Sequence, residues 1–337
     1  MNQLSFKFSR FLLLFALIIG GFCLLMSCST NMPGRSFSGN PPVNTPEIPA
    51  LSKELQGYMQ DVISSVGQRN IFLPQNLDRS ADLIESYLKS FGYTVDRQVY
   101  RVRNIDCYNL VAEKKGTTLP DEIVVIGAHY DSMFGTVGAN DNGSGTVANM
   151  ALAKHFSKIE TDRTLRFVFF TNEEPPNFQQ PTMGSLVYAR DIFDKEEHVV
   201  VMYSLETMGY FTDEPNSQKV PVLLKPFYPS TGNFIAFVSN RASSDVLKQS
   251  VASFRERVDF PSRGGALPTS IPGVSWSDHW SFWQIDVPGI MVTDTALMRY
   301  PHYHEVTDTA DKVDFDSLAR VVTGLKQVIE DQATQAP

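Results

Sequence analysis

Cysteine is scarce in this chain, which has three cysteines among 337 residues. Cys23 lies inside an apolar N-terminal run and Cys28 directly follows that run, so only Cys107 remains in the rest of the chain. If the run is removed on export and Cys28 is modified, no intramolecular disulfide is available to the mature protein. We therefore expect its stability to come from a packed core and from bound metal.

The sequence also lacks a basic excess, internal repeats and a phosphate-binding glycine pattern. The 37 acidic residues outnumber the 29 lysines and arginines, and the net charge of −8 argues against a nucleic-acid partner. The glycine-rich stretch 138–145 does not follow the G-x-G-x-x-G pattern and has no lysine nearby, which argues against nucleotide binding. An apolar content of 42% is ordinary for a globular enzyme.

The N-terminus predicts export and attachment to a membrane. Lys7 and Arg10 precede an apolar run over residues 11–26, which is short for a membrane span. The run ends in Leu25-Met26-Ser27-Cys28, which resembles the lipobox of bacterial lipoproteins, in which the cysteine is lipidated. We expect a signal peptide over 1–27, a lipidated cysteine with a flexible tether over 28–50, and a folded domain over 51–337. The expected location is the cell envelope, at the outer membrane or the periplasmic face. A plain signal anchor, or a cleaved signal with Cys28 as a bystander, is the alternative.

The remaining sequence alternates between strand and helix patterns. Apolar runs predict buried strands, apolar residues at helical spacing predict helices, and residues 95–110 contain further strand-prone stretches. The predicted strands cover residues 122–130, 165–171, 199–205, 234–238 and 290–293, and the predicted helices cover 77–91, 143–156, 183–193 and 315–332. This alternation indicates an α/β fold with a largely parallel sheet and helices on both faces.

Imidazole and carboxylate side chains follow these predicted strands. Since ligands of such sheets bind beyond the carboxyl ends of the strands, we expect these side chains to gather at one edge. They are His129, Asp131, Asp141, Glu173, Glu174, Glu206, Asp294, His302 and His304.

These residue types suit a pair of zinc ions. Zinc accepts imidazole nitrogen and carboxylate oxygen, and one aspartate can bridge two ions. Asp131 is placed to fix the second ring nitrogen of His129. A strand break at Pro175-Pro176 lets one of Glu173 and Glu174 bind metal while the other serves as a base. Each residue alone is more often solvated or a helix cap, so the prediction rests on their joint placement.

The ordered motifs resemble the co-catalytic zinc aminopeptidases, a family that includes bacterial leucyl aminopeptidases, glutamate carboxypeptidases and glutaminyl cyclases. The resemblance covers residues from about 74 to the C-terminus. Its motifs are His129-Tyr130-Asp131-Ser132, the stretch 138–145, Asn172-Glu173-Glu174, Ser277-Asp278-His279, and Tyr303-His304 with Asp308-Thr309.

The resemblance implies a three-layer sandwich with a mixed, mostly parallel sheet, the zinc exopeptidase fold, for the catalytic domain at 51–337. It also implies an aminopeptidase that hydrolyses the N-terminal residues of peptides with two zinc ions. His129 and Glu206 would bind the first ion, Glu174 and His304 the second, and Asp141 both. Glu173 would be the general base and Asp131 the partner of His129, and His302 is the rival of His304.

Two departures from the family leave questions open. Glu206 stands where the family usually has aspartate. Val274 stands where some members carry a tyrosine that stabilises the oxyanion, so the zinc, His279 or Tyr303 would have to replace it. Asp278, His279 and Tyr303 are possible substrate contacts.

Two alternative functions remain at this point. One is a glutaminyl cyclase-like aminoacyltransferase with one zinc, and the other is a catalytically silent surface lipoprotein. The sequence does not give the oligomeric state or the preferred N-terminal residue.

Overall fold

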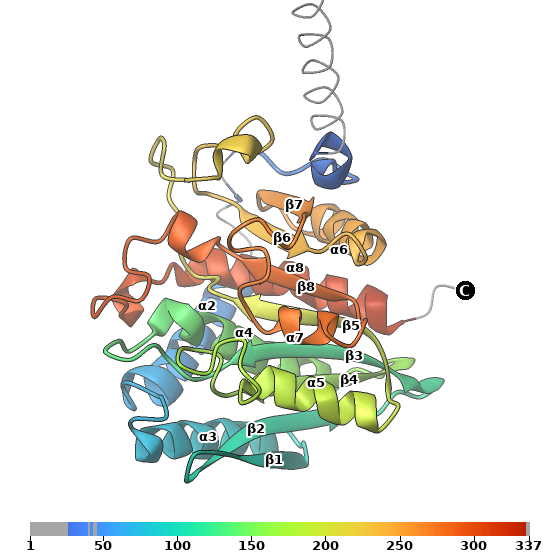
Figure 1. The fold of residues 1–337 in the computed structure, drawn as a ribbon. Helices are drawn as coiled ribbons and strands as arrows, with labels where there is room; N and C mark the ends of the chain where they lie inside the picture. The colour runs from blue at the N-terminus through green and yellow to red at the C-terminus, as the bar shows by residue number, and fades with distance from the viewer. Residues whose placement is uncertain (1–25, 40, 43–45, 335–337) are drawn as a thin grey trace, which may run out of the picture.

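The computed structural model describes residues 26–39, 41–42 and 46–334. A single eight-stranded sheet divides the molecule into three layers, with helices on both of its faces (Figure 1). The α/β sandwich expected from the sequence is therefore confirmed.

The sheet is mixed, and its central part is parallel. Its strand order is β1-β2-β4-β3-β5-β8-β6-β7. Strands β4, β3, β5 and β8 run parallel to one another, whereas β2 and β6 pair with their central neighbours in the antiparallel sense. The strands are β1 (Val95–Val102), β2 (Ile105–Lys114), β3 (Leu119–His129), β4 (Arg163–Phe170), β5 (His198–Glu206), β6 (Ile235–Ser239), β7 (Ser262–Ala266) and β8 (Gly289–Thr293).

The helices cover the two faces unequally. One face carries α2 (Glu47–Tyr58), α3 (Pro74–Ser90), α4 (Gly145–Phe156), α6 (Ser244–Arg257) and α8 (Phe315–Ala333), and the other carries α5 (Gly184–Asp194) and the short α7 (His279–Trp283). Short helical turns complete the described chain: η1 (Met59–Ser64), η2 (Ala139–Ser144), η3 (Val222–Leu224), η4 (Ala296–Met298) and η5 (Ala310–Lys312).

The central strands form where continuous apolar runs stand in the sequence. Residues 123–129 of β3 and 167–170 of β4 are all buried, as expected for parallel strands that are covered on both faces. Gly145 begins α4 where a Cβ atom would lie 2.2 Å from the carbonyl oxygen of Leu205. Glycine therefore allows the start of this helix to approach β5 closely, and this approach brings the η2 turn to the end of that strand.

Part of the segment that was predicted to be a flexible tether, residues 28–50, is packed against the domain. Helix α2 already begins at Glu47. The Arg255 guanidinium donates hydrogen bonds to the carbonyl oxygens of Met32, Pro33 and Gly34. Met32 is buried, and its side chain lies where a Cβ atom on Gly264 of β7 would stand. Composition alone suggested flexibility, but these contacts hold the segment along β7.

The predicted signal peptide falls almost entirely on residues 1–25, which lie outside the described residues. Within the described part, no helix is both long enough and apolar enough to cross a membrane. Residues 26–30 form a helical turn in which Cys28 is exposed.

Candidate metal centre

His129 is the last residue of β3, and its two ring nitrogens face different partners. Nδ1 lies 3.3 Å from the carbonyl oxygen of Asp131 and 3.5 Å from its carboxylate. Nε2 lies 3.2 Å from Glu206 Oε2 and 3.6 Å from Asp141 Oδ1. Asp131 therefore holds the ring on one side while the other nitrogen points into a group of carboxylates.

Asp131 also fixes the end of β4. Its two carboxylate oxygens accept hydrogen bonds from the backbone amides of Glu173 and Glu174, each at 3.2 Å. The backbone leaves the extended conformation here, because Asn172 has a positive φ of 60°. The two glutamates consequently point to different places. Glu174 Oε2 lies 3.4 Å from His304 Nε2, whereas Glu173 Oε2 lies 3.8 Å from His129 Nε2.

Asp141 lies between the two imidazoles. Its Oδ1 faces His129, and its Oδ2 lies 3.0 Å from His304 Nε2. Asp308 fixes the turn that carries it, since its carboxylate accepts the backbone N–H groups of Asn140 and Asp141 at 2.8 and 3.1 Å. A single carboxylate is thus presented to two histidines from a rigid loop.

Glu206 ends β5 and is held by two hydroxyl groups. Thr207 donates to its Oε1 at 2.6 Å, and Ser277 donates to its Oε2 at 2.7 Å. Although burial raises the pKa of Glu206, the neighbouring His129 and these hydrogen bonds bring it below its ordinary value. Glu206 is therefore an anionic oxygen donor directed at His129.

His304 is the histidine that the structure brings to this centre. It has a positive φ of 58°, and its ring stacks on Tyr303 with 3.9 Å between ring centroids. Burial lowers its pKa, but hydrogen bonding with Asp141 and Glu174 raises it to about 10. His302 instead lies 2.8 Å from the hydroxyl group of Thr307 and is not part of the cluster.

Among the described residues, two groups have the composition and spacing of metal sites, and they share Asp141. Within each group the ligand atoms lie within 4.8 Å of one another. The groups are His129, Asp141 and Glu206, and Asp141, Glu174 and His304.

The electrostatics of the cluster fit divalent cations. Oε1 of Glu174 is buried without a hydrogen-bond donor. Burial raises the pKa of Asp141 to about 6, and burial together with Asp141 raises that of Glu174 to about 7. Crowded buried carboxylates of this kind ionise fully only when cations balance their charge. Carboxylate and imidazole donors in this arrangement suit zinc.

Two supporting residues had no clear role in the sequence pattern. Arg69 is fully buried, and its guanidinium donates to the carbonyl oxygens of Tyr130, Val137 and Gly138. It therefore shapes the loop between His129 and Asp141 and adds a positive charge beneath the carboxylates. Asp308 served only as a spacing marker in the sequence, yet it positions Asp141.

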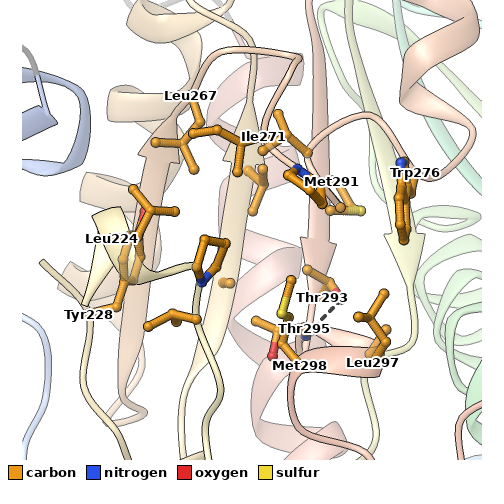
Figure 2. A pocket seen from close by; sticks show the side chains of 18 of the residues that line it. Leu224, Tyr228, Leu267, Ile271, Trp276, Met291, Thr293, Thr295, Leu297 and Met298 are labelled. Carbon is orange, nitrogen blue, oxygen red and sulfur yellow. Dashed lines mark hydrogen bonds between the residues drawn. The ribbon is translucent and has the colours of Figure 1, made fainter.

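An apolar pocket opens beside the centre (Figure 2). It encloses about 830 Å³ of empty space, part of it open to solvent, and both Glu206 and Tyr303 belong to its lining. The loop over residues 218–228 contributes one wall, and β8 and the segment before α7 contribute others. The apolar lining includes Leu224, Tyr228, Leu267, Ile271, Trp276, Met291, Leu297 and Met298.

The predicted substrate contacts at Asp278 and His279 do not fit the structure. Both side chains are fully buried and neither lines the pocket. The His279 ring packs edge-on against Trp283, and its Nε2 donates to the carbonyl oxygen of Val274 at 2.8 Å. The Ser277-Asp278-His279 motif predicted that these two residues would face the substrate. They are instead buried behind the metal centre, next to Ser277, which holds Glu206.

Residues 109–329 match Peptidase family M28. The chain belongs to this family. The expected family of zinc exopeptidases and the classification as a metallopeptidase are thereby confirmed.

The relatives span bacteria and yeast. The chain is 33% identical over 285 residues to the uncharacterized protein YfbL of Escherichia coli, covering 82% of this chain and 87% of that protein. It is 26% identical over 240 residues to the probable aminopeptidase YDR415C of Saccharomyces cerevisiae, covering 66% of this chain and about half (55%) of the yeast protein.

Solved structures share the fold. A zinc aminopeptidase from Bacillus subtilis has a TM-score of 0.68 at 14% identity, with 86% of this chain and 97% of that chain covered. A glutaminyl cyclase from Fimbriiglobus ruber has a TM-score of 0.60 at 17% identity, with 89% and 99% covered. At these identities the likeness establishes the fold only.

Proposed function

We propose that this protein is an aminopeptidase that uses two zinc ions to remove N-terminal residues from peptides. The observation that carries the proposal is the position of Asp141 between two histidine-carboxylate groups. In this assignment His129, Asp141 and Glu206 would hold one ion, and Asp141, Glu174 and His304 would hold the other. Bound zinc supplies acidified water and polarises a carbonyl group.

Glu173 is left to handle the proton. It lies 3.8 Å from His129 Nε2 and belongs to neither metal group. Burial and the nearby Glu174 raise its pKa well above its ordinary value. A carboxylate with raised basicity takes the proton from the attacking water and gives it to the leaving amine. The hydrogen bond from the Glu173 amide to Asp131 holds this base in place.

Tyr303 is the protein group best placed to stabilise the oxyanion. His279, the other protein side chain open from the sequence, is buried and turned toward Val274. Tyr303 lines the pocket together with Glu206, and its ring stacks on His304. Burial and the charges of Asp141 and Glu174 raise the pKa of its phenol, so it remains a proton donor. Its hydroxyl group therefore donates a hydrogen bond to the developing negative charge.

The pocket beside Glu206 accepts the side chain of the residue that is removed. Its lining is largely apolar, and Leu224, Met291 and Trp276 approach it from three different segments. Burial of apolar surface then favours peptides with a large apolar N-terminal residue over those with a charged one.

A panel of aminoacyl-nitroanilides tests this function, with and without chelator. We expect hydrolysis of the leucine, methionine and phenylalanine substrates, loss with chelator and recovery with zinc. Glu173→Gln should lower kcat by about 10² to 10⁴-fold with zinc content unchanged. Cyclisation of a peptide with N-terminal glutamine, without nitroanilide hydrolysis, would assign the protein to the cyclase alternative. Absence of both activities in the zinc-loaded protein would contradict an enzymatic role.

We also propose that Cys28 carries a lipid that anchors the protein in the cell envelope. The thiol is exposed and directly follows the apolar run, which supports modification at this position. Two or more acyl chains give stable attachment where a single chain is marginal. Cys28→Ser should abolish incorporation of labelled fatty acid. Unchanged labelling would refute the assignment.

A further inference from the structure

The loop over residues 219–228, with the sequence Lys-Val-Pro-Val-Leu-Leu-Lys-Pro-Phe-Tyr, has two distinct faces. Its inner face includes Val220, Leu224 and Tyr228, which line the apolar pocket. On its outer face Val222 is 76% exposed, the largest exposed fraction among the large apolar side chains that the structure describes. The pocket explains why the inner residues are apolar. It does not explain why an apolar residue, Val222, stands at the outer tip.

Basic side chains flank this tip. Lys219 and Lys225 are exposed, and both line a separate surface hollow beside the loop, which Tyr228 also borders. The protein as a whole carries a net charge of −8, so paired lysines around an exposed apolar tip are a local departure from its charge. An apolar tip with flanking lysines is the chemistry that an anionic bilayer surface attracts.

The N-terminal segment reaches the molecule at the same place. Residues 26–30 lie beside this loop (Figure 1), and Met26 is buried in one apolar cluster with Leu224. Arg255 holds residues 32–34, and Met32 packs on Gly264 of β7. Cys28 lies four positions before Met32, so it stays within about 14 Å of a fixed point.

We propose that the 219–228 loop is a second membrane contact, with Val222 entering the bilayer and Lys219 and Lys225 facing anionic headgroups. This inference goes beyond the peptidase function and rests on membrane attachment through the N-terminal segment, by the lipid or by the apolar run. Attachment through the N-terminal segment brings the loop to the membrane surface. Because this segment is short and fixed on the domain, it determines which face of the domain meets the membrane. The mouth of the pocket then lies close to the membrane.

Photo-crosslinking on vesicles tests the contact with the full chain. A benzophenone amino acid replaces Val222, and in a matched control it replaces Phe193, which is 64% exposed near the C-terminal end of α5. Helix α5 lies away from the 219–228 loop (Figure 1). Both proteins are reconstituted in vesicles of phosphatidylethanolamine and phosphatidylglycerol, recovered by flotation and irradiated. We expect lipid adducts at position 222 and none at 193.

The lysines give a second readout. Replacing Lys219 and Lys225 with glutamine should lower the yield of adducts at 222 by up to about 25-fold, since each lysine near an anionic surface contributes about fivefold in occupancy. The loss should vanish in vesicles of neutral phosphatidylcholine.

The outcomes separate the loop from the anchor and from the enzyme. Protein that floats with vesicles but gives no adduct at 222, or equal adducts at 193, would overturn the contact and leave the anchor intact. Protein that does not float would overturn both. Nitroanilide hydrolysis by the same samples reports on the peptidase independently.

Discussion

Removal of one hydroxyl group, in Tyr303→Phe, tests the proposed oxyanion donor most directly. The substitution keeps the aromatic ring that stacks on His304 at 3.9 Å. The fold, the position of His304 and the binding of zinc should therefore remain as they are. What disappears is a protonated phenol in a half-buried site, among the charges of Asp141 and Glu174.

The expected loss follows from the kind of interaction removed. A hydrogen bond that forms only as negative charge develops affects kcat more than KM. Loss of one such donor lowers kcat by about 10² to 10³-fold. We therefore expect a fall of this size in kcat for leucine nitroanilide, with KM changed by less than about threefold and with zinc content unchanged.

Tyr228→Phe is the matched control. Tyr228 lines the same pocket, but its hydroxyl group donates to the carbonyl oxygen of Gly264 at 3.1 Å and not toward the metal centre. Its replacement should leave kcat close to that of the wild type. If Tyr303→Phe behaves like this control with zinc still bound, Tyr303 is not the oxyanion donor. If it loses zinc, its role is to position His304.

Three further predictions follow from individual side-chain contacts. Ser277→Ala removes the hydroxyl group that orients Glu206 and should weaken zinc affinity by about 10 to 100-fold in a chelator competition, and unchanged affinity would contradict this role. Burial lowers the pKa of His279 to about 4, so the neutral ring stabilises the fold above pH 6.5, and that stability is lost as pH falls toward 4. Between pH 6.5 and pH 4, this histidine should cost the wild type about 3 kcal/mol of unfolding free energy. His279→Gln should not show this part of the loss. Parallel curves of unfolding free energy against pH for the two proteins would refute this. Arg255→Ala removes the hydrogen bonds that hold the N-terminal segment, so limited proteolysis of that segment should become faster, and equal cleavage rates would show that other contacts hold it.

The sequence predicted the central strands and the metal cluster for the same physical reason. Parallel strands buried on both faces need continuous apolar runs, and these runs mark where each strand ends. Because the carboxyl ends of β3, β4 and β5 meet at one edge of the sheet, His129, Glu174 and Glu206 could be expected to lie together. The coarse position of each ligand followed from the strand that carries it.

The elements that the sequence analysis missed have weaker local signals. Strand β7 (Ser262–Ala266) contains two adjacent glycines, which lower its apparent strand preference, and it forms beside β6 through tertiary pairing. The packing of residues 31–39 and 41–42 depends on distant partners such as Arg255 and Arg320. Composition describes a segment by itself, so it could not show that this one lies against the domain.

The structure answers the question that Glu206 raised in the sequence. A glutamate in place of the usual aspartate adds one methylene and raised the question whether the first metal site is intact. The structure places Glu206 Oε2 3.2 Å from His129 Nε2, with Ser277 holding the same oxygen and Thr207 holding the other. Because both oxygens are fixed by hydroxyl donors, the longer side chain is held in one orientation and its extra rotational freedom is removed. Ser277 belongs to the Ser-Asp-His motif, so that motif supports the metal centre from beneath, and the substitution at 206 is compatible with a complete ligand set.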